Sequence, residues 1–130
     1  IPDTVEGTDR TKLLEGTQAD GDEPALITCP SPFGEWTRDH GGREYRGVRT
    51  SRYTYVRTLD GPWLLYDNRE DPYQLENLCG RPERASLQRE LEASLSARLK
   101  ETGDEFLPGA KYVAKWGYKL NERGTVPYTP

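Results

Sequence analysis

The sequence predicts an α+β fold, a small four-stranded antiparallel sheet covered by one long amphipathic helix toward the C-terminus. Segments rich in β-branched and aromatic residues alternate with turn residues between positions 24 and 67, which is typical of antiparallel strands. From position 87 to position 99 a leucine recurs every fourth residue, which indicates one buried helical face. With 13 glycines and 10 prolines among 130 residues, much of the remaining chain must be turns and irregular segments.

Four segments have the composition of strands, and they are residues 24–30, 45–50, 53–58 and 63–67. The first is a short apolar run between prolines, the pattern of a buried strand. Only two residues separate the second segment from the third, which predicts a β-hairpin. The turn residues Asp60 and Gly61 then precede the fourth strand.

The long helix is expected over residues 82–102, since Pro82 suits a first helical turn and Gly103 suits a helix end. Near the N-terminus, one helical turn is expected at the apolar pair Leu13 and Leu14. Aromatic residues scattered among Gly, Lys and Pro predict an irregular tail held by aromatic contacts. The chain is therefore interpreted as a connector, a domain of sheet and helix, and a tail, over residues 1–23, 24–103 and 104–130.

The composition limits the kinds of protein that this chain can be. Hydrophobic residues make up 33% of the chain and charged residues 31%, which is lean for an independent core and favours a piece of a larger protein. The absence of methionine and the start at Ile1 favour the same interpretation. No apolar run approaches the roughly 18 residues of a membrane span. Two cysteines, Cys29 and Cys79, are too few for a disulfide framework, and whether they pair is left open together with the compartment.

Two segments resemble the C-terminal region of the sulfatase family. Residues 45–50 followed by 52–56 resemble the family's hairpin pattern R-x-V-R-T-x-x-Y-K-Y-I. Residues 65–78 resemble the pattern L-Y-D-L-x-x-D-P-x-E-x-x-N-L, in which Asn68 replaces the usual Leu and Gln74 the usual Glu. The order and spacing of the two patterns make the resemblance specific, and the opening around Val5-Glu6-Gly7-Thr8-Asp9 resembles the segment that closes the family's large domain.

The resemblance implies a parent that is a sulfuric ester hydrolase, with an α/β catalytic domain of the alkaline-phosphatase-like type. In this family a formylglycine nucleophile and a calcium ion belong to that large domain, so this chain is expected to hold no cofactor and to be inactive alone. Its implied role is to brace the catalytic domain. The implied partners are that domain and a sulfated small molecule or glycan, and the implied location of the parent is periplasmic or secreted.

One segment imitates the family's nucleophile motif C-x-P-S-R. In Cys29-Pro30-Ser31-Pro32-Phe33, a proline follows the cysteine directly, a second proline stands where serine belongs, and Phe33 stands where arginine belongs. A strand followed by a loop is also the wrong context for a nucleophile at a helix N-terminus. We therefore expect no catalytic residue in this chain.

Arginines are concentrated between residues 38 and 58, where six of them face two acidic residues, a local balance of +4 in a chain of net charge −4. Three interpretations stay open: solvated strand edges whose stems pack over tyrosines, contact with a sulfated substrate, and nucleic-acid binding. The rival to the sulfatase interpretation is therefore a free-standing β module that binds a polyanion or nucleic acid. For the chain as a whole, its acidic charge predicts no nucleic-acid partner.

The loop between the first two strands holds the candidate substrate-binding residues Trp36, Arg38 and His40. An aromatic side chain beside cationic groups suits stacking on a sugar and pairing with a sulfate. The alternative for His40 is an exposed loop histidine without a function. Because a piece of a larger protein exposes the apolar face that meets its neighbour, self-association of the chain is also expected.

Overall fold

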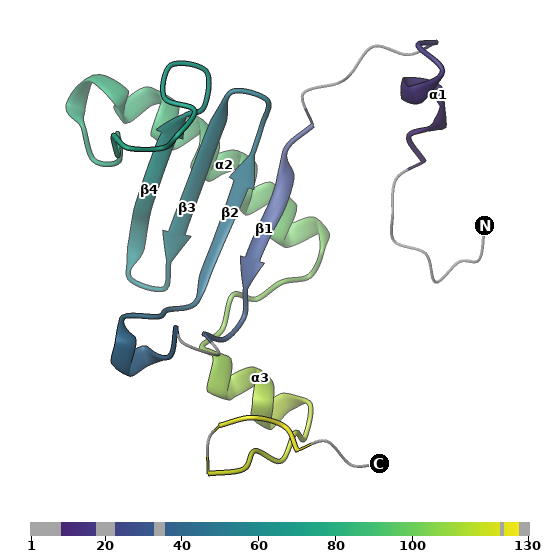
Figure 1. Ribbon diagram of the computed structural model, residues 1–130, viewed down its shortest axis with the longest axis vertical. Helices are drawn as coiled ribbons and strands as arrows, with labels where there is room; N and C mark the ends of the chain where they lie inside the picture. The colour runs from purple at the N-terminus through teal and green to yellow at the C-terminus, as the bar shows by residue number, and fades with distance from the viewer. Residues whose placement is uncertain (1–8, 18–22, 33–35, 123, 128–130) are drawn as a thin grey trace.

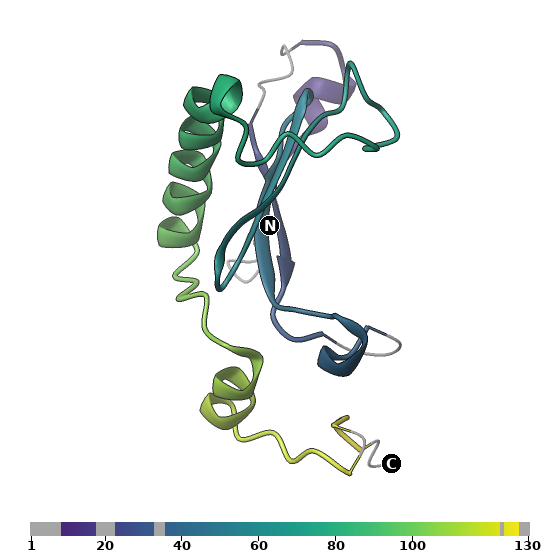
Figure 2. The same cartoon turned by 90° about the vertical axis from the view of Figure 1, so that its left-hand side faces the viewer.

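The computed structural model describes residues 9–17, 23–32, 36–122 and 124–127. One four-stranded antiparallel sheet has the strand order β1-β2-β3-β4, and a long helix, α2, lies across one of its faces (Figures 1 and 2). The strands are β1 (Ala25–Cys29), β2 (Tyr45–Arg49), β3 (Tyr53–Thr58) and β4 (Gly61–Asp67). The helices are α1 (Thr11–Leu14), α2 (Ala85–Glu101) and α3 (Gly109–Lys115), with 3-10 turns at Arg38–His40 and Pro82–Arg84. The predicted α+β class is thus confirmed.

The core lies between the sheet and α2. Val48, Tyr55 and Leu65 are paired across β2, β3 and β4, and all three are fully buried. Because side chains alternate along a strand, this register places one set of residues against the helix. The facing side chains from α2 are the leucines of the predicted stripe, Leu91, Leu95 and Leu99, with Leu87 partly buried beside them.

The segment that leads from β4 to α2 is held by backbone-directed side chains. Asn77 accepts hydrogen bonds from the N–H groups of Leu65 and Cys79, both at 3.0 Å, and donates to the carbonyl of Trp63 at 2.9 Å. These bonds cover the outer edge of β4, which pairs with no further strand. Asp67 caps the turn that directly follows β4, since its carboxylate accepts hydrogen bonds from the Arg69 and Glu70 N–H groups.

A buried arginine joins the sheet to the segment after α2. Arg46 is 1% exposed, and its guanidinium forms a two-point contact with Asp104 at 2.5 and 3.1 Å. The remaining N–H groups donate to the carbonyls of Cys29 and Tyr45 and to the Tyr112 hydroxyl. All five donors of the guanidinium are therefore used, which is what a buried arginine requires.

Both chain ends contain a short helix. The helical turn expected at Leu13 and Leu14 is confirmed as α1, which buries no residue and lies apart from the sheet (Figure 1). Within the tail, the structure has the seven-residue helix α3, where the sequence indicated only irregular chain. Tyr112 in α3 is buried beside Arg46, so a tertiary contact stabilises this helix.

Candidate functional site

The loop from β1 to β2 carries the three predicted site residues, and its backbone is tightly turned. The Thr37 carbonyl accepts hydrogen bonds from the N–H groups of His40 and Gly42, both at 2.9 Å, so the chain reverses around the 3-10 turn Arg38–His40. A Cβ atom on Gly42 would lie 1.7 Å from the carbonyl oxygen of Trp36. Only glycine fits at this position, because a real Cβ cannot approach a backbone atom so closely.

Trp36, Arg38 and His40 all lie on the exposed surface of this loop. Trp36 is 72% exposed, and no ring contact joins it to another described aromatic residue. Arg38 contacts the Glu44 carboxylate while 60% of its side chain stays exposed. His40 Nδ1 lies 3.2 Å from the Thr37 hydroxyl. The structure thus places the three residues on one short segment of surface, and none of them lines the hollow beside Arg46 and Trp116.

Two further residues extend this surface, and sequence reasoning missed them. The Arg43 guanidinium lies 5.2 Å from the centre of the Trp63 ring, which is within cation–π range. The Trp63 ring also contacts Tyr45, with 6.1 Å between ring centres. Trp63 has no partner in the β3–β4 register, which shifts between Val56 and Arg57. The alternation of residues along a strand does not indicate such a bulge, so this contact could not be predicted from the sequence.

Glu44 fixes the base of the loop from inside. It is 1% exposed, and its Oε1 atom accepts a hydrogen bond from the backbone N–H of Gly109 at 2.6 Å, in addition to the contact with Arg38. The carboxylate thereby satisfies a buried donor at the start of α3 and holds one cation of the loop. The loop and α3 consequently form one packed unit at the same end of the sheet (Figure 1).

Four of the six arginines of the basic segment pair with carboxylates, and three of these carboxylates lie outside the segment. Arg52 contacts Asp67 at 2.8 Å, and Arg57 contacts Glu92 of α2 at 2.5 Å. Arg46 and Arg38 are paired as described above. Aromatic rings also pack against these cations, for example Tyr53 beside Arg52. The Arg52 guanidinium lies 5.0 Å from the centre of the Tyr53 ring, and the ion pairs largely cancel the local excess of positive charge.

The two cysteines are free thiols. Burial raises the pKa of both Cys29 and Cys79, and Glu44 adds to the rise for Cys29, so neither is an activated thiolate. Cys29 ends β1, and Phe33 of the imitated nucleophile motif lies outside the described residues.

The described part of the chain contains no group of three or more His, Cys, Asp or Glu residues that could hold a metal ion. Its helices are also too short or too polar to cross a membrane.

Comparison with known proteins identifies relatives over most of the chain. Residues 1–101 match the family model described as N-sulphoglucosamine sulphohydrolase, C-terminal. An "Ulvan-active sulfatase" of Formosa agariphila is 40% identical over 129 residues, covering 98% of this chain and 25% of that protein. An "N-acetylglucosamine-6-O-sulfatase" of Bacteroides thetaiotaomicron is 26% identical over 109 residues, covering 80% of this chain and 19% of the relative.

A solved structure has the same fold over this region. It contains D-glucosamine-2-N,6-O-disulfate as its substrate, is 26% identical, and superposes with a TM-score of 0.67 over 85% of this chain and 22% of the other. The chain thus spans about a quarter or less of the length of the relatives that it matches. The family match, the relatives and the sheet with its covering helix agree with the resemblance of the hairpin and the β4 segment, and the chain belongs to the family of N-sulphoglucosamine sulphohydrolase C-terminal domains.

Proposed function

We propose that this chain is the C-terminal part of a larger sulfatase, and that it braces the catalytic domain through the sheet face opposite α2. The observation that carries the proposal is the composition of that face. Apolar and aromatic side chains point away from α2 on all four strands; Val56 among them is buried, and Ile27, Tyr45, Leu64 and Tyr66 are partly exposed. No described helix covers them (Figure 2).

The loop after β4 extends this apolar surface. It lies on the side of the sheet opposite α2 (Figure 2), where Gln74 bonds to the Thr54 hydroxyl at 3.2 Å. Two large apolar side chains of the same loop, Tyr73 and Leu75, are 83% and 85% exposed. The exposure of two large apolar side chains beside the partly exposed sheet face supports an interface, because apolar surface is unfavourable in contact with water. In the separated chain, the same face would support self-association.

Catalysis would belong to the catalytic domain. The family's formylglycine and calcium do not fit the described residues of this chain, which offer neither a metal-ligand cluster nor an activated cysteine. Residues 1–23 would connect to that domain, residues 24–103 would form the bracing unit, and residues 104–130 would add the tail.

A sulfated glycan is the substrate class that the relatives support for the parent protein. The loop with Trp36, Arg38 and His40 would contact it beside the active site. Arg38 offers a largely exposed guanidinium that can pair with a sulfate, and Trp36 offers an exposed ring. The Arg43–Trp63 contact places a second cation and ring next to this loop.

The bracing role is tested by charge substitution on the proposed interface. Leu64→Lys should lower the melting temperature of the full-length protein more than that of the isolated chain, because Leu64 is partly exposed in the isolated chain and would become fully covered at the interface. Leu59→Lys is the matched control, since Leu59 lies exposed beside the β3–β4 turn. Equal effects of Leu64→Lys on both proteins would contradict the interface, as would no effect on either.

A further inference from the structure

A hollow of about 250 Å³ lies between the end of β1, the end of α2 and α3. The residues that matter for its chemistry are Thr28, Arg46, Asp104, Glu105, Tyr112, Lys115 and Trp116. It is separate from the loop that carries Trp36, Arg38 and His40. Its volume is below the range of about 300–1,000 Å³ typical of pockets for drug-sized ligands, so it suits a single ring-sized group.

The floor of the hollow is formed by Arg46, Asp104 and Tyr112, which are hydrogen-bonded to one another. All five N–H donors of Arg46 are used, and the Tyr112 hydroxyl donates to Asp104 at 2.8 Å while it accepts the Leu107 N–H at 3.0 Å. The Arg46–Asp104 charge pair is therefore closed to an incoming anion. A ligand would gain its polar contacts at the rim.

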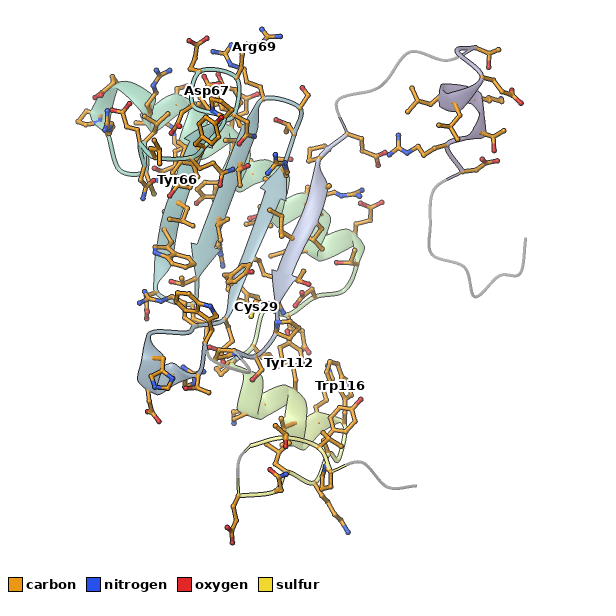
Figure 3. All side chains as sticks on the ribbon, viewed as in Figure 1. Cys29, Tyr66, Asp67, Arg69, Tyr112 and Trp116 are labelled. Atoms are coloured by element: carbon orange, nitrogen blue, oxygen red, sulfur yellow. The ribbon has the colours of Figure 1, made fainter. Side chains whose placement is uncertain are left out.

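One wall is a pre-positioned aromatic platform. The Trp116 ring stacks on Tyr112, with 5.1 Å between ring centres and 27° between planes, and Tyr118 meets it edge-on at 6.1 Å. Figure 3 shows Tyr112 and Trp116 extending from α3 below the end of β1. Trp116 nevertheless stays 56% exposed. An indole that is fixed by its neighbours and open to solvent loses little conformational entropy when a ligand packs on it.

The rim presents a hydrogen-bond donor beside an acceptor. The Lys115 ammonium lies 2.5 Å from the Glu105 carboxylate, and both side chains are more than half exposed. The two cations and two carboxylates around the hollow cancel, so an anionic ligand gains no net attraction. Two neighbouring hydroxyl groups match this arrangement, since one can accept from Lys115 and the other can donate to Glu105.

We propose that this hollow binds an uncharged pyranose residue of a glycan, with the apolar face of the ring on Trp116 and two hydroxyls on Lys115 and Glu105. The apolar C–H groups of a sugar ring suit an aromatic surface, and its hydroxyls suit the balanced charge pair. The site would bind a residue of the glycan that is distant from the sulfate ester that the catalytic domain hydrolyses. The assignment rests on the hollow itself and does not require sulfatase activity.

The test is a titration followed by the indole N–H resonance of Trp116 in the NMR spectrum of the 130-residue chain. The neutral probes are tetrasaccharides of glucose, xylose and galactose, and the anionic probe is a heparin tetrasaccharide. At least one neutral probe should shift the Trp116 signal to saturation, with little dependence on salt. Trp116→Ala, in which binding is followed by the backbone amide resonances of residues 109–115 because the indole is removed, should weaken binding by about tenfold or more. Tyr73→Ala is the control, since it removes an aromatic ring that is even more exposed and lies elsewhere, and it should leave affinity unchanged.

A second variant keeps the test valid if Trp116→Ala disturbs α3. Glu105→Gln leaves the aromatic stack intact and should weaken binding of the same probe severalfold. Absence of any shift with all three neutral probes would overturn the proposal. Tighter, salt-dependent binding of heparin would make the hollow a polyanion site instead. A shift of the Trp116 signal with protein concentration alone would show that a second copy of the chain covers the ring. Protection of Trp116 from solvent in the full-length protein would assign the ring to the domain interface. Each of these results would overturn sugar binding in the hollow.

Discussion

The buried carboxylate of Glu44 accepts a hydrogen bond from the backbone N–H of Gly109, across 65 positions of sequence. This bond joins the base of the β1–β2 loop to the first turn of α3. The backbone of Gly109 is tightly packed, because the Ser31 side chain occupies the space that a Cβ atom at Gly109 would need. The candidate loop and the C-terminal helix therefore support each other, and a change at their junction should affect both.

The first prediction concerns Gly109→Ala. A Cβ atom at this position would lie 2.7 Å from Ser31 Oγ and 3.0 Å from the Pro30 carbonyl oxygen, so α3 or the loop must move. We expect a loss of about 1–3 kcal/mol in the free energy of unfolding, measured by urea denaturation. Ala110→Ser, at the exposed neighbouring position, is the control and should change stability little. An unchanged Gly109→Ala protein would show that the junction is loosely packed.

The second prediction concerns the buried Arg46–Asp104 pair. Arg46→Ala removes the cation that pairs with the Asp104 carboxylate and the N–H donors of the Cys29 and Tyr45 carbonyls, which should cost about 3–5 kcal/mol of stability. Arg46→Lys keeps the charge but cannot make the two-point contact, so its loss should be smaller and measurable even if the alanine variant fails to fold. Arg49→Ala, which removes an exposed arginine of the same strand, is the control. If Arg46→Ala and Arg49→Ala have equal stability, the network does not hold the tail to the sheet.

The third prediction concerns acid unfolding. Burial alone would raise the pKa of Asp104, but hydrogen bonds from Arg46, the Phe106 N–H and Tyr112 outweigh it and hold that pKa below its usual value. The Arg52 guanidinium lowers the pKa of Asp67 in the same sense. A lowered folded-state pKa contributes stability above the unfolded value of about 3.9 and loses it as pH falls through the folded value.

The unfolding free energy should therefore fall as pH drops below about 4, and less steeply in Asp67→Asn and Asp104→Asn than in the unaltered chain. Asp60→Asn, at the β3–β4 turn, serves as the control and should keep the original slope. The measurement is denaturant unfolding at a series of acidic pH values. Identical slopes in all four proteins would mean that these carboxylates gain nothing from ionisation in the folded state.

The fourth prediction concerns the loop in the full-length enzyme. Trp36→Ala, Arg38→Ala and His40→Ala should raise KM for the sulfated glycan, by about tenfold for the most important residue, with a smaller change in kcat. The reason is loss of stacking and sulfate pairing away from the reacting bond. Steady-state kinetics on glycan and on a small aryl sulfate separate this effect from misfolding, because the aryl sulfate cannot reach the loop. Unchanged kinetics for all three variants would remove the loop from substrate binding.

Much of the fold could be predicted from local patterns, because both the hairpin and the leucine stripe repeat at the period of their own element. The buried state of Arg46 could not, since its partner Asp104 lies 58 positions away. Helix α3 was missed for the same reason. Pro108 and Gly109 look like a helix break, and the contacts that stabilise the helix come from Glu44 and Arg46.

The two departures from the sulfatase pattern have a shared structural explanation that sequence reasoning did not reach. Asn68 and Gln74 bond to each other through their side-chain amides at 2.9 Å, and Asn68 also accepts the Thr54 hydroxyl at 3.1 Å. Gln74 adopts a positive φ of 54°, which these bonds help to hold. For the candidate site, the sequence could identify the loop, but the Arg43–Trp63 contact depends on a bulge and on side-chain packing across strands.

The most direct test of the account compares sulfate release by three preparations: this chain alone, the full-length protein, and the full-length protein with Leu64→Lys. The substrates are a generic aryl sulfate and ulvan oligosaccharides. The account predicts no turnover by the chain alone, turnover by the full-length protein, and reduced activity after Leu64→Lys because the bracing face is disrupted. Sulfate release by the isolated chain, or its absence from the full-length protein on every sulfate ester tried, would contradict the assignment of this chain as the brace of a sulfatase.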